Sequence, residues 1–406
     1  MDKQPIPYNP ALLRWARLEA GLSLDEAAER AGISAPRKRK DEKEQQTPAD
    51  RLKAWENGAL SPTLPQLEDL AAAYRRPLTT FFLLSPPAKQ TNLADFRTIG
   101  SKSRQRDTPE FAAFKRRLEA RHAELKEIMQ LEGKEPIRFI GSACDTRDAK
   151  IVVKAMRKTL NFSFSDQQTL PSSEELLRVL RARIQFVGIF VLIEGDLGSH
   201  HTKISTEEFR GIAFADKLAP LIVINSNDTN AAKLFTLLHE LAHLWIGESG
   251  ISNLNAFSHG LPSQPNREKQ CNAIAAEFLV PENELKNSLD ETKYSTAEEA
   301  IDDLSKLFKV SKEVVARRML DFDYISSDTY SGLIRAYHEI WKKYRERMRD
   351  SGSGPSRNKL DYYRLGEHML NTVTGAAADG RITYQEAARI LRIPVSRFDK
   401  VLYAHN

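Results

Sequence analysis

The apolar run at 234–246 constrains this chain more than any other stretch, because two histidines and a glutamate interrupt it. Its apolar residues cover more than half of the circumference of a helix, and a helix that is apolar nearly all round is buried. Burying His239, Glu240 and His243 costs free energy unless these groups are paired or bind a metal. The run therefore predicts a buried helix, at about 229–246, that carries a polar site.

The spacing of the two histidines indicates a metal site. His239 and His243 are four residues apart, which places both imidazoles on one face of a helix, within reach of one ion. Zinc accepts imidazole nitrogen, and a catalytic zinc site uses three protein ligands and a water. Glu240 beside that water can take its proton and pass it to a leaving amine. The pattern predicts metal-assisted peptide hydrolysis, with one Zn²⁺ per chain and Mn²⁺ as a substitute.

The third metal ligand is expected on a second helix, at about 267–280. Glu268 and Glu277 both lie there, and the alanines between them allow a close approach to a neighbouring helix. Glu268 can also be interpreted as a carboxylate that the dipole favours at a helix N-terminus. The chemistry alone leaves Glu268 and Glu277 as equal candidates.

Three short segments, at 188–193, 211–215 and 221–224, are rich in β-branched and aromatic residues and are separated by Gly, Asp and Ser. They predict three strands of one small sheet. A free edge on the second or third strand is expected to hold an extended peptide as an added strand. Helical patterns fill most of the remaining chain, so the predicted fold is α+β and predominantly helical.

Other polar residues are weaker candidates for the site. His200, His201 and His259 fall in predicted loops and could donate a hydrogen bond to an oxyanion, although such histidines are more often only solvated. Asn225 and Asn272 could contact a metal ligand or the substrate. Asn225 could equally stabilise a turn.

Composition limits the class of protein. The chain has 406 residues, a net charge of +5 and 41% hydrophobic residues, which predicts a globular protein of two to four domains. No apolar run of about 18 residues occurs, so no membrane span is predicted. Two cysteines far apart in sequence do not form a disulfide framework, and we expect a cytoplasmic protein. The small positive charge is compatible with nucleic-acid binding without arguing for it.

The motifs resemble those of the ImmA/IrrE family of bacterial metallopeptidases. The resemblance rests on His239-Glu-Leu-Ala-His243-Leu and on Glu268-x-x-Cys-Asn272-x-x-Ala-Ala-Glu277-Phe-Leu-Val-Pro, and it covers about 150–322. It implies a zincin-like domain of the gluzincin type in which Glu268 is the third ligand. Glu277 then contacts a metal ligand from outside or is a packing residue. It also implies a narrow task, the cleavage of a repressor or another regulatory protein.

The first part of the chain predicts short helices at 12–19, 25–31, 48–56 and 64–74. A charged insert at 37–46 has no apolar residue to bury and is expected to be solvated. The basic residues that could contact DNA phosphates are Arg37, Lys38, Arg39, Lys40, Arg51 and Lys53. The alternative is a small helical bundle that contacts protein, or a decoy of the substrate.

This part resembles the Xre (lambda-repressor-like) helix-turn-helix family over about 9–87. The resemblance rests on Ala27-Ala-Glu-Arg-Ala-Gly32, on Leu52-Lys-Ala-Trp55-Glu-Asn-Gly58 and on the segment 61–71. The insert departs from the family pattern, because it places eight charged residues between Gly32 and the expected recognition helix. The resemblance implies a DNA-binding module.

We therefore predict an Xre-like domain at 1–87, a helical linker at 88–149, a zinc peptidase domain at 150–325 and a helical C-terminal region at 326–406. The predicted function is endopeptidase cleavage of a regulatory protein in a stress, mobile-element or toxin–antitoxin context. A toxin is one further partner to consider. The alternative function is a DNA-binding regulator or antitoxin-like protein whose metal site is structural or sensory. No function is assigned to 326–406.

Overall fold

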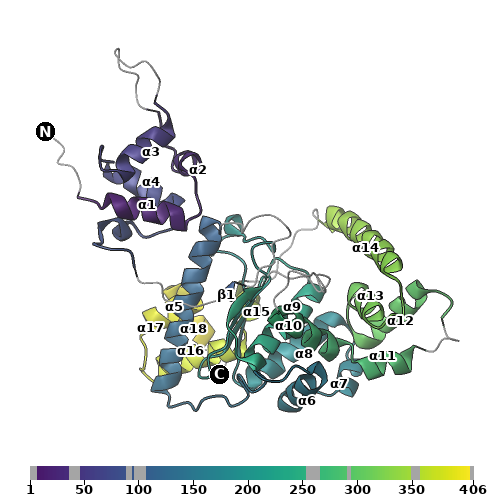
Figure 1. Cartoon of the computed structure of the whole chain (residues 1–406). Coiled ribbons are helices and arrows are strands. Elements are labelled where there is room, and N and C mark those ends of the chain that lie inside the picture. Colours follow the sequence, from purple (N-terminus) through teal and green to yellow (C-terminus); the bar gives the residue numbers. More distant parts are fainter. Residues whose placement is uncertain are drawn as a thin grey trace. The chain divides into compact units, whose positions relative to one another are not determined.

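The computed structural model describes residues 7–35, 46–87, 94–95, 107–252, 266–289, 294–348 and 357–402 (Figure 1). The chain divides into two compact units. Unit 1 comprises Met1–Thr91, Ile99–Ala120 and Asp196–Ile204, and unit 2 comprises Asn92–Thr98, Arg121–Gly195 and Ser205–Asn406. Among the described residues, no helix combines the length and apolar character that crossing a membrane would require.

Unit 1 contains the four predicted N-terminal helices, α1 (Pro10–Glu19), α2 (Leu24–Arg30), α3 (Pro48–Glu56) and α4 (Leu64–Ala73), and a 3-10 helix, η1 (Leu78–Phe82). Capping boxes at Ser23 and Thr47 fix where α2 and α3 begin. A shared apolar core joins the helices, with Leu13, Leu52, Trp55, Leu67, Leu70 and Phe81 at its centre. The structure thus confirms the four predicted helices.

Unit 2 is built on a mixed sheet whose strand order is β1-β5-β3-β4-β2. The strands are β1 (Ala94–Asp95), β2 (Phe190–Ile193), β3 (Gly211–Phe214), β4 (Leu221–Ile224) and β5 (Gly250–Ser252). β2, β3 and β4 confirm the three predicted strands, but β5 and β1 extend the sheet beyond them. The expectation of a free edge on β3 or β4 is wrong, because both are interior strands with a neighbour on each side.

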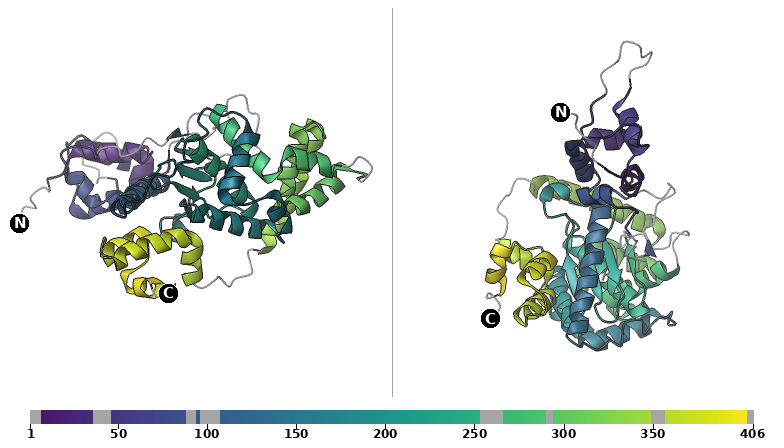
Figure 2. Two further views of the ribbon diagram at one scale, coloured as in Figure 1. Left: turned by 90° about the horizontal axis from the view of Figure 1, so that it is seen from below. Right: turned by 90° about the vertical axis from the view of Figure 1, so that its left-hand side faces the viewer.

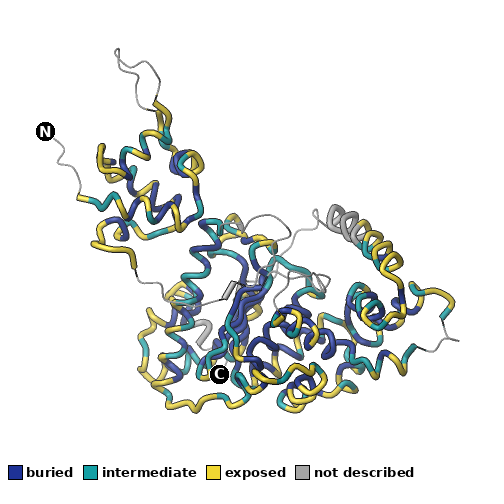
Figure 3. Tube along the Cα trace, viewed as in Figure 1, coloured by how far each residue is buried: buried dark blue, intermediate teal, exposed yellow. Residues whose placement is uncertain are grey.

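Both faces of this sheet are covered by helices (Figure 3). α8 (Ser173–Phe186) and α9 (Asn230–Ile246) pack on one face, where alternate residues such as Ala213 and Ile222 join their apolar core. On the other face His122, from α5 (Pro109–Leu131), stacks on Phe214. The full burial of β2, β3 and β4 explains why their sequences are continuously apolar.

The remaining helices of unit 2 form two groups, which stay apart in both views of Figure 2. One group consists of α10 (Asn266–Leu279), α11 (Glu282–Ser288), α12 (Ala297–Phe308), α13 (Lys312–Asp321) and α14 (Ser327–Met348). Two helices from earlier in the chain, α6 (Ala149–Leu160) and α7 (Phe164–Thr169), pack against this group. The other is α15 (Arg357–Leu365), α16 (Glu367–Ala378), α17 (Tyr384–Leu391) and α18 (Val395–Leu402).

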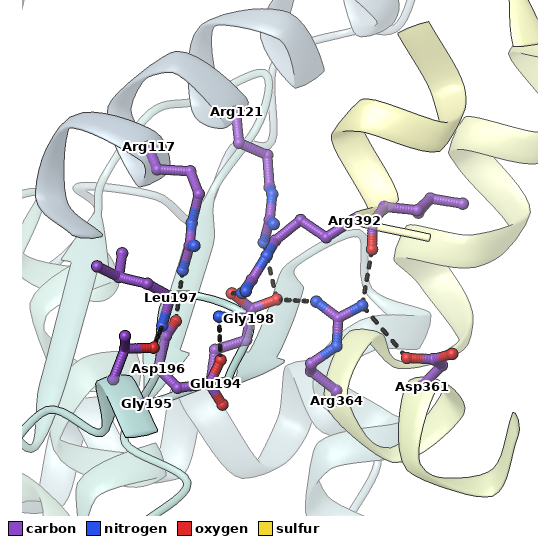
Figure 4. A network of polar contacts seen from close by, with 12 residues as sticks. Arg117, Arg121, Glu194, Gly195, Asp196, Leu197, Gly198, Asp361, Arg364 and Arg392 are labelled. Carbon is purple, nitrogen blue, oxygen red and sulfur yellow. Dashed lines mark hydrogen bonds and ion pairs between the residues drawn. The ribbon is translucent and has the colours of Figure 1, made fainter. Parts of the chain in front are cut away.

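The C-terminal helices are attached to β2 by a buried ion network (Figure 4). Glu194, which directly follows β2, is 2% exposed and accepts hydrogen bonds from Arg121 at 3.0 Å, Arg364 at 2.6 Å and Arg392 at 2.9 Å. Asp361 in turn accepts from Arg397 at 2.6 Å. One buried carboxylate thus binds guanidinium groups from α5, from α15 and from the residue that follows α17.

Candidate metal centre

α9 forms where the sequence predicts it, and its ends are well defined. Thr229 caps the N-terminus by accepting a hydrogen bond from the backbone of Ala232 at 3.2 Å. Asp228, one residue earlier, forms an ion pair with Arg210. Gly247 ends the helix with a φ of +87°, a conformation that glycine adopts without strain. Every residue of α9 from position 233 onward is buried.

Two histidines of α9 and one glutamate of α10 converge in the interior of unit 2. The Nε2 atoms of His239 and His243 are 3.1 Å apart. The carboxylate oxygens of Glu268 lie 3.3 Å from the first nitrogen and 3.1 Å from the second. One donor atom from each residue falls within a group whose members are no more than 4.8 Å apart. This arrangement offers three ligand atoms to a single ion.

Glu268 reaches the histidines from the first turn of α10, which packs against α9. Ala275 and Ala276 are buried, and their small side chains allow the two helices to approach closely. Glu268 is fully buried, and burial alone would raise the pKa of its carboxyl group. Interactions with the imidazoles of His239 and His243 outweigh that effect and lower the pKa to about 2. Glu268 is therefore an anion at the centre of the cluster.

A second residue of α10 fixes the orientation of His239. The Oδ1 atom of Asn272 lies 2.9 Å from Nδ1 of His239, and Asn272 is fully buried. An amide oxygen can only accept, so Nδ1 carries the proton and donates it. The lone pair of His239 is then on Nε2, the atom that faces Glu268 and His243. Such a partner for the outer nitrogen is usual for a metal-binding histidine.

Glu240 lies beside the cluster and is fully buried. Its Oε1 atom accepts a hydrogen bond from the hydroxyl of Ser252, at the end of β5. Its Oε2 atom is buried and has no hydrogen-bond partner among the described residues. Burial raises the pKa of the Glu240 carboxyl, and the nearby charges of His239 and His243 offset part of that rise. A carboxylate of raised pKa in this place is suited to accept and return a proton.

Residues 189–320 match the family model of the IrrE N-terminal-like domain, a peptidase family.

This match supports an ImmA/IrrE-type family for the matched residues, which we call the IrrE-like region, and with it a metallopeptidase. The IrrE-like region contains β2 to β5, α9 and α10, and so the whole His-His-Glu cluster. A metallopeptidase family and this cluster together indicate a divalent metal. No curated protein matches the chain. The IrrE-like region does not include residues 1–188, so the Xre-like domain stays a prediction.

The structure places the other predicted site residues of the IrrE-like region away from the histidines. Glu277 accepts a hydrogen bond from Arg318 at 2.5 Å and contacts the backbone nitrogen of Glu282, at the start of α11, at 3.3 Å. These are the contacts of a packing residue. Asn225 donates to the backbone oxygen of Phe209 at 3.0 Å and so holds the loops that flank β3 and β4.

Several predicted residues have no described place at the metal centre. His259 and Arg37, Lys38, Arg39 and Lys40 lie outside the described residues. His201 is exposed and belongs to unit 1. The backbone of His200 also belongs to unit 1. On α3, Lys53 is exposed, whereas Arg51 lies over the Trp55 ring and donates to the backbone oxygen of Ser34 at 3.3 Å.

Two residues of the IrrE-like region that touch Glu240 were not predicted from the sequence, Ser252 and Gly211. Gly211 opens β3, and a Cβ atom there would lie 2.1 Å from Oε1 of Glu240. A glycine at the start of a strand can signal such a close approach of another group. Ser252 gives no comparable signal, because its importance depends on the strand pairing that brings it to Glu240.

Proposed function

We propose that this chain is a zinc-dependent endopeptidase in which His239, His243 and Glu268 hold the metal. The convergence of these three donor atoms in a buried site carries the proposal. Two imidazoles and one carboxylate are a donor set of catalytic zinc sites, in which a fourth position stays open. Mn²⁺ is a substitute that the same donors accept.

The buried oxygens of Glu268 support metal binding by the cluster independently of the family match. Both oxygens of Glu268 are buried, and neither accepts a hydrogen bond from the described residues. A buried carboxylate with two unsatisfied oxygens is costly, and a cation between it and the imidazoles would compensate for that cost. The donors therefore fit a divalent ion.

In the proposed mechanism, a zinc ion held by His239, His243 and Glu268 would supply the Lewis acidity that polarises the peptide carbonyl and lowers the pKa of a water. Glu240 accepts a proton from the attacking water and then delivers it to the nitrogen of the leaving amine. Asn272 keeps His239 in the tautomer that binds through Nε2. The burial of Glu240 excludes bulk water and raises its affinity for the proton it must carry.

The proposed substrate is a repressor or another regulatory protein, cleaved in a stress, mobile-element or toxin–antitoxin context. The resemblance to ImmA/IrrE peptidases supports a narrow substrate range. The chain also contains the helical unit 1, whose apolar core is separate from the core around the cluster. A second folded unit beside the proposed peptidase supports a regulatory setting.

The test compares the full chain, loaded with zinc, with its Glu240→Gln variant on a peptide library made from a bacterial proteome. We expect both proteins to retain one zinc per chain and only the wild type to produce new peptide termini, which mass spectrometry detects. Equal cleavage by Glu240→Gln would contradict the proposed mechanism.

DNA binding through unit 1 is a second candidate function. α2 and α3 pack against each other as a helix pair, and Lys53 is exposed on α3. Selection of the full chain on random duplexes tests it, with Lys53→Ala as the variant. Binding that survives in Lys53→Ala, or no enrichment at all, would count against a role for α3 in DNA contact.

A further inference from the structure

Gly211 and Ser252 form one rung of the sheet in unit 2, because they are paired residues of the antiparallel strands β3 and β5. Paired residues of antiparallel strands place their side chains on the same face of the sheet. That face is the one covered by α9, and Glu240 of α9 contacts both residues. The two residues of this rung therefore constrain the Glu240 side chain together.

The two residues of the rung contribute opposite properties. At position 211 an added Cβ would lie 2.1 Å from Oε1, 2.5 Å from Cδ and 2.6 Å from Cγ of Glu240, so only glycine leaves room for the carboxylate. At position 252 a hydroxyl donates a hydrogen bond to the same oxygen, Oε1. Ser252 is 3% exposed, and its backbone oxygen accepts from the nitrogen of Arg210 at 2.8 Å. The donor is thus fixed on a buried strand.

These contacts distinguish the two oxygens of Glu240. Oε1 is held between Ser252 and Gly211, whereas Oε2 is buried without a hydrogen-bond partner in the part of the chain that the structure describes. Free rotation of a carboxylate would exchange the two oxygens. A donor on one of them, with no space to turn, prevents that exchange and leaves Oε2 as the oxygen available for proton transfer.

We propose that Ser252 is a positioning residue for Glu240, and that Gly211 provides the space in which Ser252 holds it. The inference rests on the proposed function, since it assigns to Oε2 the proton that moves from the attacking water to the leaving amine. Ser252 touches neither of these groups, and it acts through Glu240 alone.

The test uses the full chain loaded with Co²⁺, because Co²⁺ absorbs visible light according to its surroundings whereas Zn²⁺ does not. The variants are Ser252→Ala, Ser252→Thr, which keeps the hydroxyl, and Glu240→Gln. We expect all of them to hold one cobalt per chain. Ser252→Ala should change the visible spectrum toward that of Glu240→Gln, and Ser252→Thr should match the wild type.

Cleavage of a library peptide by the zinc-loaded proteins gives a second readout. A lost partner of an active-site group typically costs 10–100-fold, so we expect Ser252→Ala to lose roughly 10–100-fold in rate and Ser252→Thr to recover most of it. If Ser252→Ala matches the wild type in both spectrum and rate, the positioning role is overturned. If the wild type cleaves nothing while the spectrum still depends on Ser252, the positioning role stands and the peptidase proposal fails.

Gly211→Ala provides an independent check should Ser252→Ala not retain cobalt. The added methyl group should displace Glu240 and give the Glu240→Gln spectrum, with Gly375→Ala as the matched control because a Cβ at Gly375 meets no atom within 4 Å. A Gly211→Ala protein with the wild-type spectrum would overturn the proposal.

Discussion

The Oδ1 atom of Asn272 lies 2.9 Å from Nδ1 of His239 and joins α10 to α9 beside the three proposed ligands. α10 therefore contributes twice to the candidate centre, through Glu268 in its first turn and through Asn272 one turn later. The second contact sets which nitrogen of His239 carries a proton, and so it sets the donor atom of the site.

We expect Asn272→Ala to lower metal affinity by roughly 10–100-fold, because His239 loses the acceptor that fixes its tautomer. Competition with a chromophoric chelator measures the affinity. Asn272→Asp keeps an acceptor oxygen and serves as the matched control, which should bind more tightly than Asn272→Ala. Wild-type affinity in Asn272→Ala would mean that the hydrogen bond has no part in metal binding.

Glu268 and Glu277 provide a paired test of the ligand set. Glu268→Gln should weaken metal binding by about 100-fold or more, since a ligand matters more than the outer partners whose loss costs 10–100-fold. Glu277→Gln changes the same functional group on the same helix but affects the contacts with Arg318 and with the backbone of Glu282. It should retain one metal per chain by elemental analysis. Loss of metal from Glu277→Gln alone would reverse our assignment.

Glu194→Ala should destabilise unit 2, because it leaves Arg121, Arg364 and Arg392 without their shared carboxylate. Removing one partner of a buried ion pair costs about 3–5 kcal/mol. Urea unfolding of the full chain measures the free energy of unfolding, and Glu298→Ala, a change at an exposed helical glutamate, is the control. Equal stability of the two variants would show that the network contributes nothing.

His368 makes the stability of unit 2 depend on pH. Burial lowers its pKa from the ordinary 6.5 to about 4, and its ring stacks on Phe190 with centroids 4.4 Å apart. Below the ordinary pKa the unfolded chain binds a proton that the folded chain does not, so stability falls as pH falls toward the folded value. Relative to wild type, His368→Phe should lose about 2 kcal/mol less between about pH 7 and about pH 5. His201→Phe, at an exposed position, is the matched control.

The sequence predicted the elements whose signals are local. α9 has a capping residue, a stop at Gly247 and an apolar pattern around its histidines, so its extent could be read directly. β5 and β1 have three and two residues, too few to show a strand pattern. β5 covers the outer edge of β3, and β2, a predicted strand, covers that of β4, so the expected free edge was wrong for both strands.

Contacts between distant positions could not be predicted. Residue types alone left Glu268 and Glu277 equal, and the ImmA/IrrE resemblance favoured Glu268. The structure brings Glu268 to the histidines because it lies in the turn of α10 that faces them. Arg364 and Arg392 meet Glu194 across 170 and 198 residues of chain. Each looks like an ordinary surface arginine in sequence, so nothing indicated that the C-terminal helices pack on β2.

Unit 1 draws on three stretches of chain, and the last of them, Asp196–Ile204, follows β2 of unit 2. The ribosome adds residues in order, so unit 1 lacks its final segment until Ile204 has been made. By then β2 has already been synthesised, while β4, the strand that pairs with it, has not. Unit 1 is therefore complete only after the first strand of the unit 2 core has been made, although its own apolar core, within residues 13–81, is synthesised much earlier.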